Sequence, residues 1–160
     1  MFRARFIILF ISTLALFSCD RNGVYEANID TQNDCWNINN TVTFTVPVVD
    51  TVSFQNIIVN IRNTTDYPNA NLYLFVTTTS PSGATLCDTI EGILADDQGK
   101  WLGKGFGYIH DNRIIYKHNI RFPQKGDYKI AIRQAMRTEE LKGISSVGVR
   151  VEKSILGSKN

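Results

Sequence analysis

Hydrophobic and polar residues alternate along most of this chain, and the alternation limits the fold more than any other feature. Val42, Phe44 and Val46 are separated by threonines, and residues 57–62 and 128–133 repeat the same period of two. Successive side chains of a β-strand point to opposite faces, so this period predicts strands with one buried face.

Three further segments have strand character, and we expect seven to nine strands in all. Residues 72–76 are apolar on both faces, which is typical of a central strand, and residues 113–122 and 147–151 also have strand character. Turn-forming residues separate these segments at 65–69, 80–83 and 123–126, and only residues 135–142 have the composition for a helical turn or two. The sequence therefore predicts an all-β fold, a single antiparallel β-sandwich.

The N-terminus has the three parts of a secretory signal. Arg3 and Arg5 precede an apolar run over 6–17, which is shorter than the about 20 residues needed to cross a bilayer, and Ser18 and Cys19 follow. This ending resembles a bacterial lipobox; the alternative is an ordinary signal peptide with a chance cysteine. We expect a cleaved signal peptide over 1–18, a lipidated tether over 19–23 that begins at Cys19, and a β-sandwich domain over 24–160.

Charge and export exclude several kinds of partner. Without Arg3 and Arg5, the exported part keeps fifteen of the 17 basic residues against 15 acidic ones. A neutral domain lacks the excess of cations that binding to nucleic acid requires. Nucleoside triphosphates are scarce outside the cytoplasm, so we expect neither a nucleic acid nor a nucleotide as ligand.

The stretch GKWLGKGFG at 99–107 has the composition of a phosphate-binding loop but not its spacing. A Walker A motif needs four residues between its first glycine and its Gly-Lys pair, and Ser or Thr after that pair. Here only three residues separate Gly99 from Gly103, and Lys104 is followed by Gly105. We interpret the stretch as a candidate partner-docking loop in which Trp101 is structural while Lys104 and Phe106 are exposed. The loop residues are Gly99, Lys100, Trp101, Gly103, Lys104, Gly105, Phe106 and Gly107. Alternation of Gly103, Gly105 and Gly107 suggests a strand face or a bulge.

No pattern indicates catalysis, a metal site or a cofactor. His118 shares its strand parity with Tyr116 and Ile120, which predicts a core-facing or interface side chain, and neither His110 nor His118 has a second His or Cys at ligand spacing. Residues 143–148 lack the glycine that a nucleophile elbow places two residues after its serine.

Two cysteines remain beyond the lipobox. An oxidising compartment favours a disulfide between Cys35 and Cys87. A buried cysteine also serves as a small apolar side chain, and the strand-like surroundings of Cys87 fit that role. Both interpretations stay open.

Several segments together resemble one known family. They are Asp66–Leu72, Asp88–Glu91, Leu94–Gly107, Arg121–Tyr128, Gln134–Arg137 and Gly143–Gly148, in this order behind the lipobox. They resemble the gliding motility lipoprotein GldH family of Bacteroidota over nearly the whole exported chain. The resemblance implies a lipid-anchored, non-enzymatic accessory protein of the gliding and type IX secretion machinery. It also implies partners among other envelope proteins of that machinery and a location facing the periplasm, with inner or outer membrane left open. Members also occur in organisms that do not glide.

A glycan-binding lipoprotein is the alternative function. It would hold peptidoglycan or another polysaccharide on aromatic rings, for which the candidates are Trp36, Tyr67, Tyr73 and Trp101. Exposed coplanar rings in a shallow groove would favour this interpretation, whereas buried rings would favour the structural one. A hydrolase is a distant third.

Overall fold

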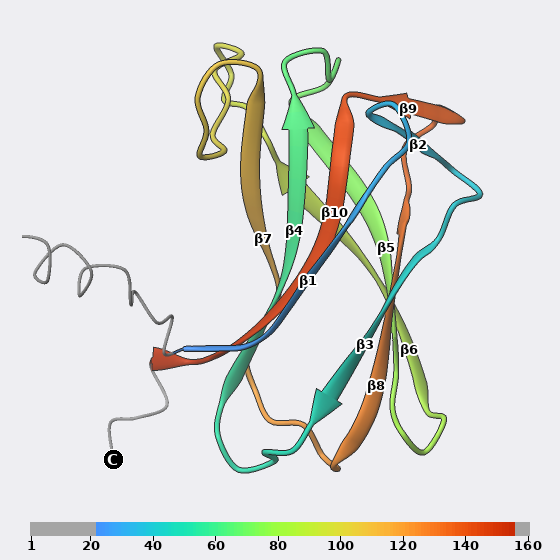
Figure 1. The fold of residues 1–160 in the computed structure, drawn as a ribbon, viewed down its shortest axis with the longest axis vertical. Helices are drawn as coiled ribbons and strands as arrows, with labels where there is room; N and C mark the ends of the chain where they lie inside the picture. The colour runs from blue at the N-terminus through green and yellow to red at the C-terminus, as the bar shows by residue number, and fades with distance from the viewer. Residues whose placement is uncertain (1–21, 156–160) are drawn as a thin grey trace, which may run out of the picture.

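The computed structural model describes residues 22–155, which form an almost entirely β structure (Figure 1). The strands are β1 (Gly23–Asp30), β2 (Cys35–Asn37), β3 (Val42–Val48), β4 (Gln55–Thr64), β5 (Asn71–Thr79), β6 (Thr85–Ile93), β7 (Ile109–Ile120), β8 (Gly126–Gln134), β9 (Glu140–Lys142) and β10 (Ile144–Lys153). The predicted signal peptide and Cys19 lie outside the described residues. Within residues 22–155 no helix is long and apolar enough to cross a membrane.

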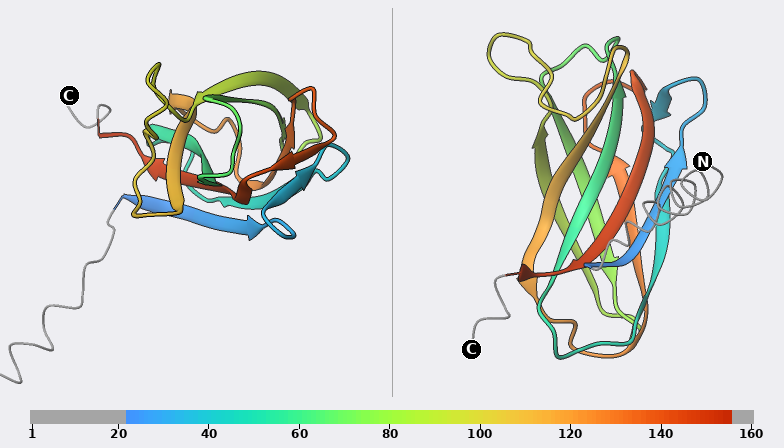
Figure 2. Two further views of the ribbon diagram at one scale, coloured as in Figure 1. Left: turned by 90° about the horizontal axis from the view of Figure 1, so that it is seen from above. Right: turned by 60° about the vertical axis from the view of Figure 1, so that its left-hand side comes forward.

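Two antiparallel four-stranded sheets pack face to face. One sheet has the order β1-β10-β4-β7 and the other β3-β8-β5-β6, while β2 and β9 form a separate two-stranded ribbon. The view from above in Figure 2 shows the two layers enclosing one interior. The predicted antiparallel β-sandwich is confirmed. Ten strands occur instead of seven to nine, and β2 and β9 have only three residues each.

The alternation places the core as expected. In β3 the even-numbered residues from Val42 to Val48 are buried and the threonines between them are exposed. Ile130 and Ile132 of β8 and Val59 of β4 meet them in the interior with no exposed surface or almost none. Five of the six segments expected to be strands lie wholly in strands of the structure, and the sixth, 113–122, runs two residues past the end of β7 at Ile120.

The helical turns expected over 135–142 are wrong. The buried side chain of Gln134 accepts a hydrogen bond from the Met136 amide and donates one to the Thr138 carbonyl, both at 2.8 Å. These bonds satisfy the backbone in a bend, and the chain then pairs as β9. Leu141 of β9 lies opposite Trp36 of β2, and both side chains are buried.

His118 also differs from the expectation, because its side chain is exposed. The pairing of β7 with β4 shifts register on either side of Ile57, and Asn119 has a φ of 54°. Both irregularities interrupt the regular alternation of β7, so strand parity no longer predicts which side chains face the core.

The edge strands β6 and β7 of the two sheets face each other. Asp88 of β6 accepts hydrogen bonds from the Tyr116 hydroxyl and the Lys117 ammonium of β7, each at 2.8 Å. The Lys117 bond, followed by the Tyr116 bond, lowers the pKa of Asp88. A Cβ on Gly92 of β6 would lie 2.2 Å from the Ile114 side chain, so the two edges touch there.

Candidate partner-binding site

The chain between β6 and β7 folds into two consecutive hairpins that project beyond the end of the sandwich (Figure 2, right, yellow). The first hairpin comprises residues 94–102 and is closed by a 2.8 Å bond from the Leu102 amide to the Leu94 carbonyl. The second hairpin comprises residues 104–111, and its end residues Lys104 and Asp111 exchange two backbone hydrogen bonds of 2.8 and 2.7 Å. The docking loop predicted from the sequence covers the last four residues of the first hairpin, 99–102, and the first half of the second.

The turn of the first hairpin is organised by Asp96. Its carboxylate accepts hydrogen bonds from the amides of Gln98 and Lys100 at 3.0 and 2.9 Å. Gly99 has a φ of 79°, a conformation that residues with a Cβ rarely adopt. This glycine therefore shapes a turn. The strand face or bulge expected from Gly103, Gly105 and Gly107 is not formed, because these residues lie between β6 and β7 and outside both strands.

Trp101 holds the first hairpin against the body of the protein. Its half-buried ring packs on the edge of the core, stacks on His110 at 5.7 Å between centroids and lies 6.5 Å from the ring of Tyr67. This packing agrees with the structural role expected for Trp101, which stays a prediction. His110 is thus a stacking partner; within the described residues no group of three His, Cys, Asp or Glu side chains could hold a metal ion.

The second hairpin is held at its base and free at its tip. Gly105 packs so closely that a Cβ there would lie 2.0 Å from the Ile109 carbonyl oxygen. Gly107 supplies the turn with a φ of 74°. Between them, Phe106 is 100% exposed, and the Lys104 side chain is also exposed, both as expected.

Tyr108 ties this hairpin to the loop that follows β4. Its hydroxyl donates to the Asp66 carboxylate at 2.7 Å, and its carbonyl accepts from the Thr65 amide at 2.9 Å. These bonds fix the hairpin directly after its turn, so the exposure of Phe106 does not arise from a free loop.

Beneath the hairpins lies a buried amide cluster that the sequence analysis missed. The Asn112 amide group donates to Asn63 at 2.8 Å and reaches the Ile61 carbonyl at 3.3 Å. A Cβ on Gly103 would lie 2.8 Å from the Asn112 side chain, so glycine allows the chain to cross above it. In the sequence, the signal for this cluster is Asn112, a polar residue at a position of β7 where the alternation predicts a core-facing side chain.

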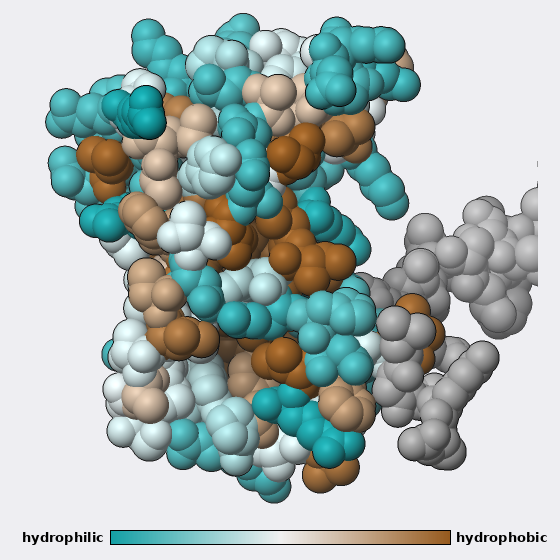
Figure 3. Space-filling model, turned by 180° about the vertical axis from the view of Figure 1, so that it is seen from behind, coloured by the Kyte–Doolittle hydropathy of each residue, from teal (hydrophilic) through white to brown (hydrophobic). Residues whose placement is uncertain are grey.

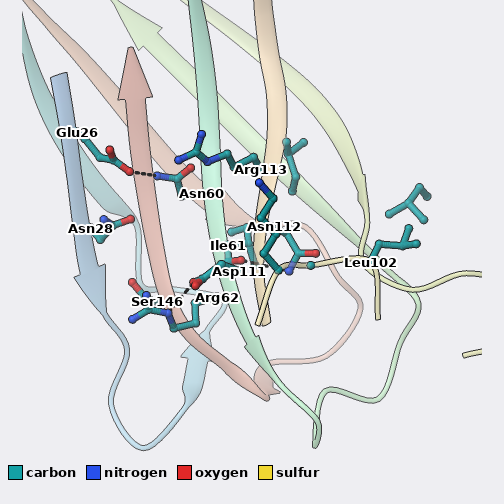
Figure 4. A pocket seen from close by; sticks show the side chains of 14 residues that line it. Glu26, Asn28, Asn60, Ile61, Arg62, Leu102, Asp111, Asn112, Arg113 and Ser146 are labelled. Carbon is teal, nitrogen blue, oxygen red and sulfur yellow. Dashed lines mark hydrogen bonds and ion pairs between the residues drawn. The ribbon is translucent and has the colours of Figure 1, made fainter. Parts of the chain in front are cut away.

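A groove of about 520 Å³ runs from these hairpins over β7 onto the outer face of the sheet β1-β10-β4-β7 (Figure 4). Leu102, Gly103 and Lys104 contribute to its wall, so the loop singled out in the sequence lines it. Arg113 and Asn60 project into it from the neighbouring strands β7 and β4.

Most charges of this outer face are paired with one another. Arg150, which is 5% exposed, binds Glu26 at 2.6 Å and Glu152 at 2.7 Å. Arg62 binds Asp111 at 2.7 Å, which raises the pKa of Arg62. Among the described residues the side chains of Lys104 and Arg113 have no ion-pair partner, and the groove therefore offers two cations to a partner.

The aromatic platform of the glycan-binding alternative is not formed. Trp36 and Tyr67 are buried, and they donate to the carbonyls of Asn40 and Asn71 at 2.8 and 2.7 Å. Trp101 is half-buried against His110, which leaves only Tyr73 of the four rings exposed. Buried rings cannot stack on a sugar, so these residues favour the structural interpretation over the glycan-binding one.

The possible disulfide is not formed, because Cys35 and Cys87 are both free. The Cys35 thiol donates to Glu140 at 3.0 Å, and this bond is the main cause that raises the pKa of Cys35. Cys87 is exposed on β6, so the buried apolar role expected for it is also wrong.

The sequence comparisons with known proteins agree on one family. The model of the GldH lipoprotein family matches residues 23–151. The "Gliding motility lipoprotein GldH" of Flavobacterium johnsoniae is 38% identical over 152 residues, which cover 91% of this chain and 94% of the relative. The "Gliding motility lipoprotein GldH homolog" of Christiangramia forsetii is 36% identical over 156 residues, covering 92% and 95%.

Solved structures give only a weak likeness. The VP2 subviral particle of infectious bursal disease virus aligns with 85% of this chain at a TM-score of 0.37 and 16% identity, and only 34% of the viral chain is covered. The Gx strain of the same virus aligns at a TM-score of 0.32 and 14% identity, over 83% of this chain and 32% of the viral one. Likeness at this level carries no argument about function.

Proposed function

Because the chain belongs to the GldH lipoprotein family, we propose that it is a lipid-anchored envelope protein that serves gliding motility as a non-enzymatic docking component. The family match and the names of two relatives support the lipoprotein character and the link to gliding. Participation in type IX secretion extends this proposal, and the partners would then be other envelope proteins of the gliding and secretion machinery.

The anchor is Cys19, whose acyl chains hold the domain at a membrane with the sandwich facing the periplasm. Only Asp20, Arg21 and Asn22 separate this cysteine from β1, so the tether is short. Several acyl chains, each with many buried methylenes, make such attachment practically permanent. Cys19→Ala should abolish incorporation of labelled fatty acid at the N-terminus; label that persists there would contradict the assignment.

The observation that carries the docking role is the fully exposed Phe106 on a hairpin whose base is fixed. Exposed aromatic rings on a rigid support provide large contact area at low entropic cost, and interface hot spots are enriched in large side chains. Lys104 and Arg113 lie beside the groove below and favour a partner surface with carboxylates.

The test is a Lys104→Ala, Phe106→Ala double variant of the full-length lipoprotein. We expect an unchanged melting temperature together with a loss of colony spreading and of type IX cargo secretion. A matched control is Val52→Ala with Lys129→Ala, which also removes an exposed aliphatic side chain and a lysine but lies away from the hairpins. Wild-type spreading and secretion in the stably folded hairpin variant would exclude the docking role.

A further inference from the structure

A second cleft, of about 420 Å³, lies between the two sheets at the end opposite the hairpins. Its walls are mostly apolar and come from Ile57, Leu86, Ile120 and Phe122. At its inner end the Tyr116 hydroxyl closes it through bonds to Asp88 at 2.8 Å and Thr78 at 3.2 Å. Figure 3, the view from behind, shows hydrophobic side chains gathered in a hollow of the surface. An apolar cleft of this volume with a few placed polar groups is typical of a small-molecule site.

One wall of the cleft carries a buried polar atom without a partner. Tyr128 is 3% exposed, its ring packs edge-on against Phe122 at 4.8 Å, and its hydroxyl has no hydrogen-bond partner among the described residues. Buried hydroxyls are nearly always bonded, because an unbonded one loses its hydration without compensation. Tyr128 is also one of the residues that line the cleft.

The mouth of the cleft is basic. Lys117 is paired with Asp88 at 2.8 Å, whereas the Arg121 guanidinium lies over the ring of Phe54 at 4.0 Å and has no carboxylate partner among the described residues. Arg121 immediately precedes Phe122 in the chain, and both residues line the cleft. An anionic group at the mouth would therefore meet an uncompensated cation.

The strand register places this mouth near the start of β1. Gly23 pairs with Glu152, Glu152 pairs with Asn56, and the Asn56 side chain accepts from the Asn119 amide at 2.8 Å. Three strand steps of about 4.8 Å separate the start of β1 from the end of β7, or about 14 Å. The chain from Cys19 to Gly23 spans at most a similar length. This step rests on the proposed anchor at Cys19, which would hold the mouth close to the bilayer.

We propose that this cleft binds one acyl chain of an anionic membrane phospholipid. The chain lies against Ile57, Leu86 and Ile120, the Tyr128 hydroxyl donates to the ester carbonyl, and Arg121 binds the phosphate. Apolar walls, an unpartnered hydroxyl and an unpaired cation are the groups that the methylenes, the ester and the phosphate of such a lipid would contact.

The test uses the full-length lipoprotein in cells that are fed an alkyne-tagged fatty acid with a photoreactive diazirine. After irradiation, mass spectrometry of tryptic peptides should find lipid adducts on residues 114–117, 118–121, 122–125 and 126–129, and the adduct mass should include glycerophosphate. Label on the N-terminal peptide reports acylation of Cys19 separately, so failure of the anchor and failure of the cleft are distinguishable in one sample.

Two variants probe the cleft itself. Tyr128→Phe should retain or raise the melting temperature, because it removes an unbonded buried hydroxyl, yet it should reduce the cleft adducts several-fold. Ala84→Trp fills the mouth from an exposed position and should reduce them similarly, whereas Thr89→Trp, exposed on the same β6 edge but outside the cleft, should not.

Three results would overturn the proposal. They are adducts spread evenly over the surface peptides, cleft adducts that Tyr128→Phe leaves unchanged, and an adduct that joins these peptides to the anchor of Cys19 itself. The last result would identify the protein's own acyl chain as the occupant.

Discussion

The two hairpins that join β6 to β7 are adjacent in sequence and similar in composition, but they are held differently. The first packs its aromatic residue, Trp101, against the core and His110, whereas the second leaves Phe106 in solvent. Both hairpins need glycine for their turns, at Gly99 and Gly107. This difference shows that the glycines determine the backbone path of each hairpin. An aromatic ring that does not pack against the body of the protein, here Phe106, is available to contact a partner.

The largest expected effect is that of Trp101→Ala. The substitution removes a half-buried indole from the stack with His110 and Tyr67, so we expect a loss of about 2–3 kcal/mol in the free energy of unfolding, below the range for fully buried aromatic residues. Denaturant unfolding measures it. A loss under about 0.5 kcal/mol would mean that the first hairpin, like the second, is not held to the body of the protein by its aromatic residue.

Gly105→Ala should have the next largest effect. Its Cβ would lie 2.0 Å from a backbone oxygen of Ile109, which cannot rotate away, so the second hairpin must open at a cost of about 2 kcal/mol. Gly107→Ala is the matched control, because its Cβ meets no atom within 4 Å and only the φ of 74° opposes it, at about 1 kcal/mol. Equal costs for the two variants would show that the close contact with Ile109 is not important.

Tyr108→Phe tests the link between the second hairpin and the loop that follows β4. The variant loses the exposed 2.7 Å bond to Asp66 but keeps the ring, so we expect about 0.5–1 kcal/mol and faster amide hydrogen exchange over residues 104–111. Exchange at Lys104 and Asp111 as slow as in the unmodified protein would indicate that their backbone pair alone fixes the hairpin.

Phe106→Ala should change stability least. A fully exposed side chain contributes within about 0.5 kcal/mol, so its thermal unfolding should overlap that of the unmodified protein. The contrast with Trp101→Ala is the sharpest form of the comparison. A melting temperature lowered as much as by Trp101→Ala would show that Phe106 packs in solution.

The sequence predicted the sandwich because its alternating segments are long enough to show their period. β2 and β9 were not predicted, since a strand of three residues is too short to show a period of two. β1 was not predicted either, because Tyr25 and Ala27 on its inner side are only half-buried and its hydrophobic pattern is correspondingly weak.

At the candidate site, the sequence indicated the loop and the different roles of Trp101 and Phe106. It did not indicate why the glycines are needed, because their neighbours are Asn112 and Ile109, which approach only after the chain has turned twice. The error at residues 135–142 has the same origin: the bonds of Gln134 that shape the bend replace helical ones, and composition does not report them.

The pairing of β1 with β10 has a mechanical consequence. β1 leaves the proposed anchor at Gly23 and pairs with β10 as far as Asp30 opposite Ser146, while the hairpins lie at the far end of the same sheet. Tension between a membrane at one end and a moving partner at the other therefore pulls β1 lengthwise along β10. The hydrogen bonds of that ladder then bear the load together, in shear, instead of opening one after another as in a zipper. With the proposed anchor and partner in place, the domain would therefore transmit force along its strands without unravelling from its anchored end.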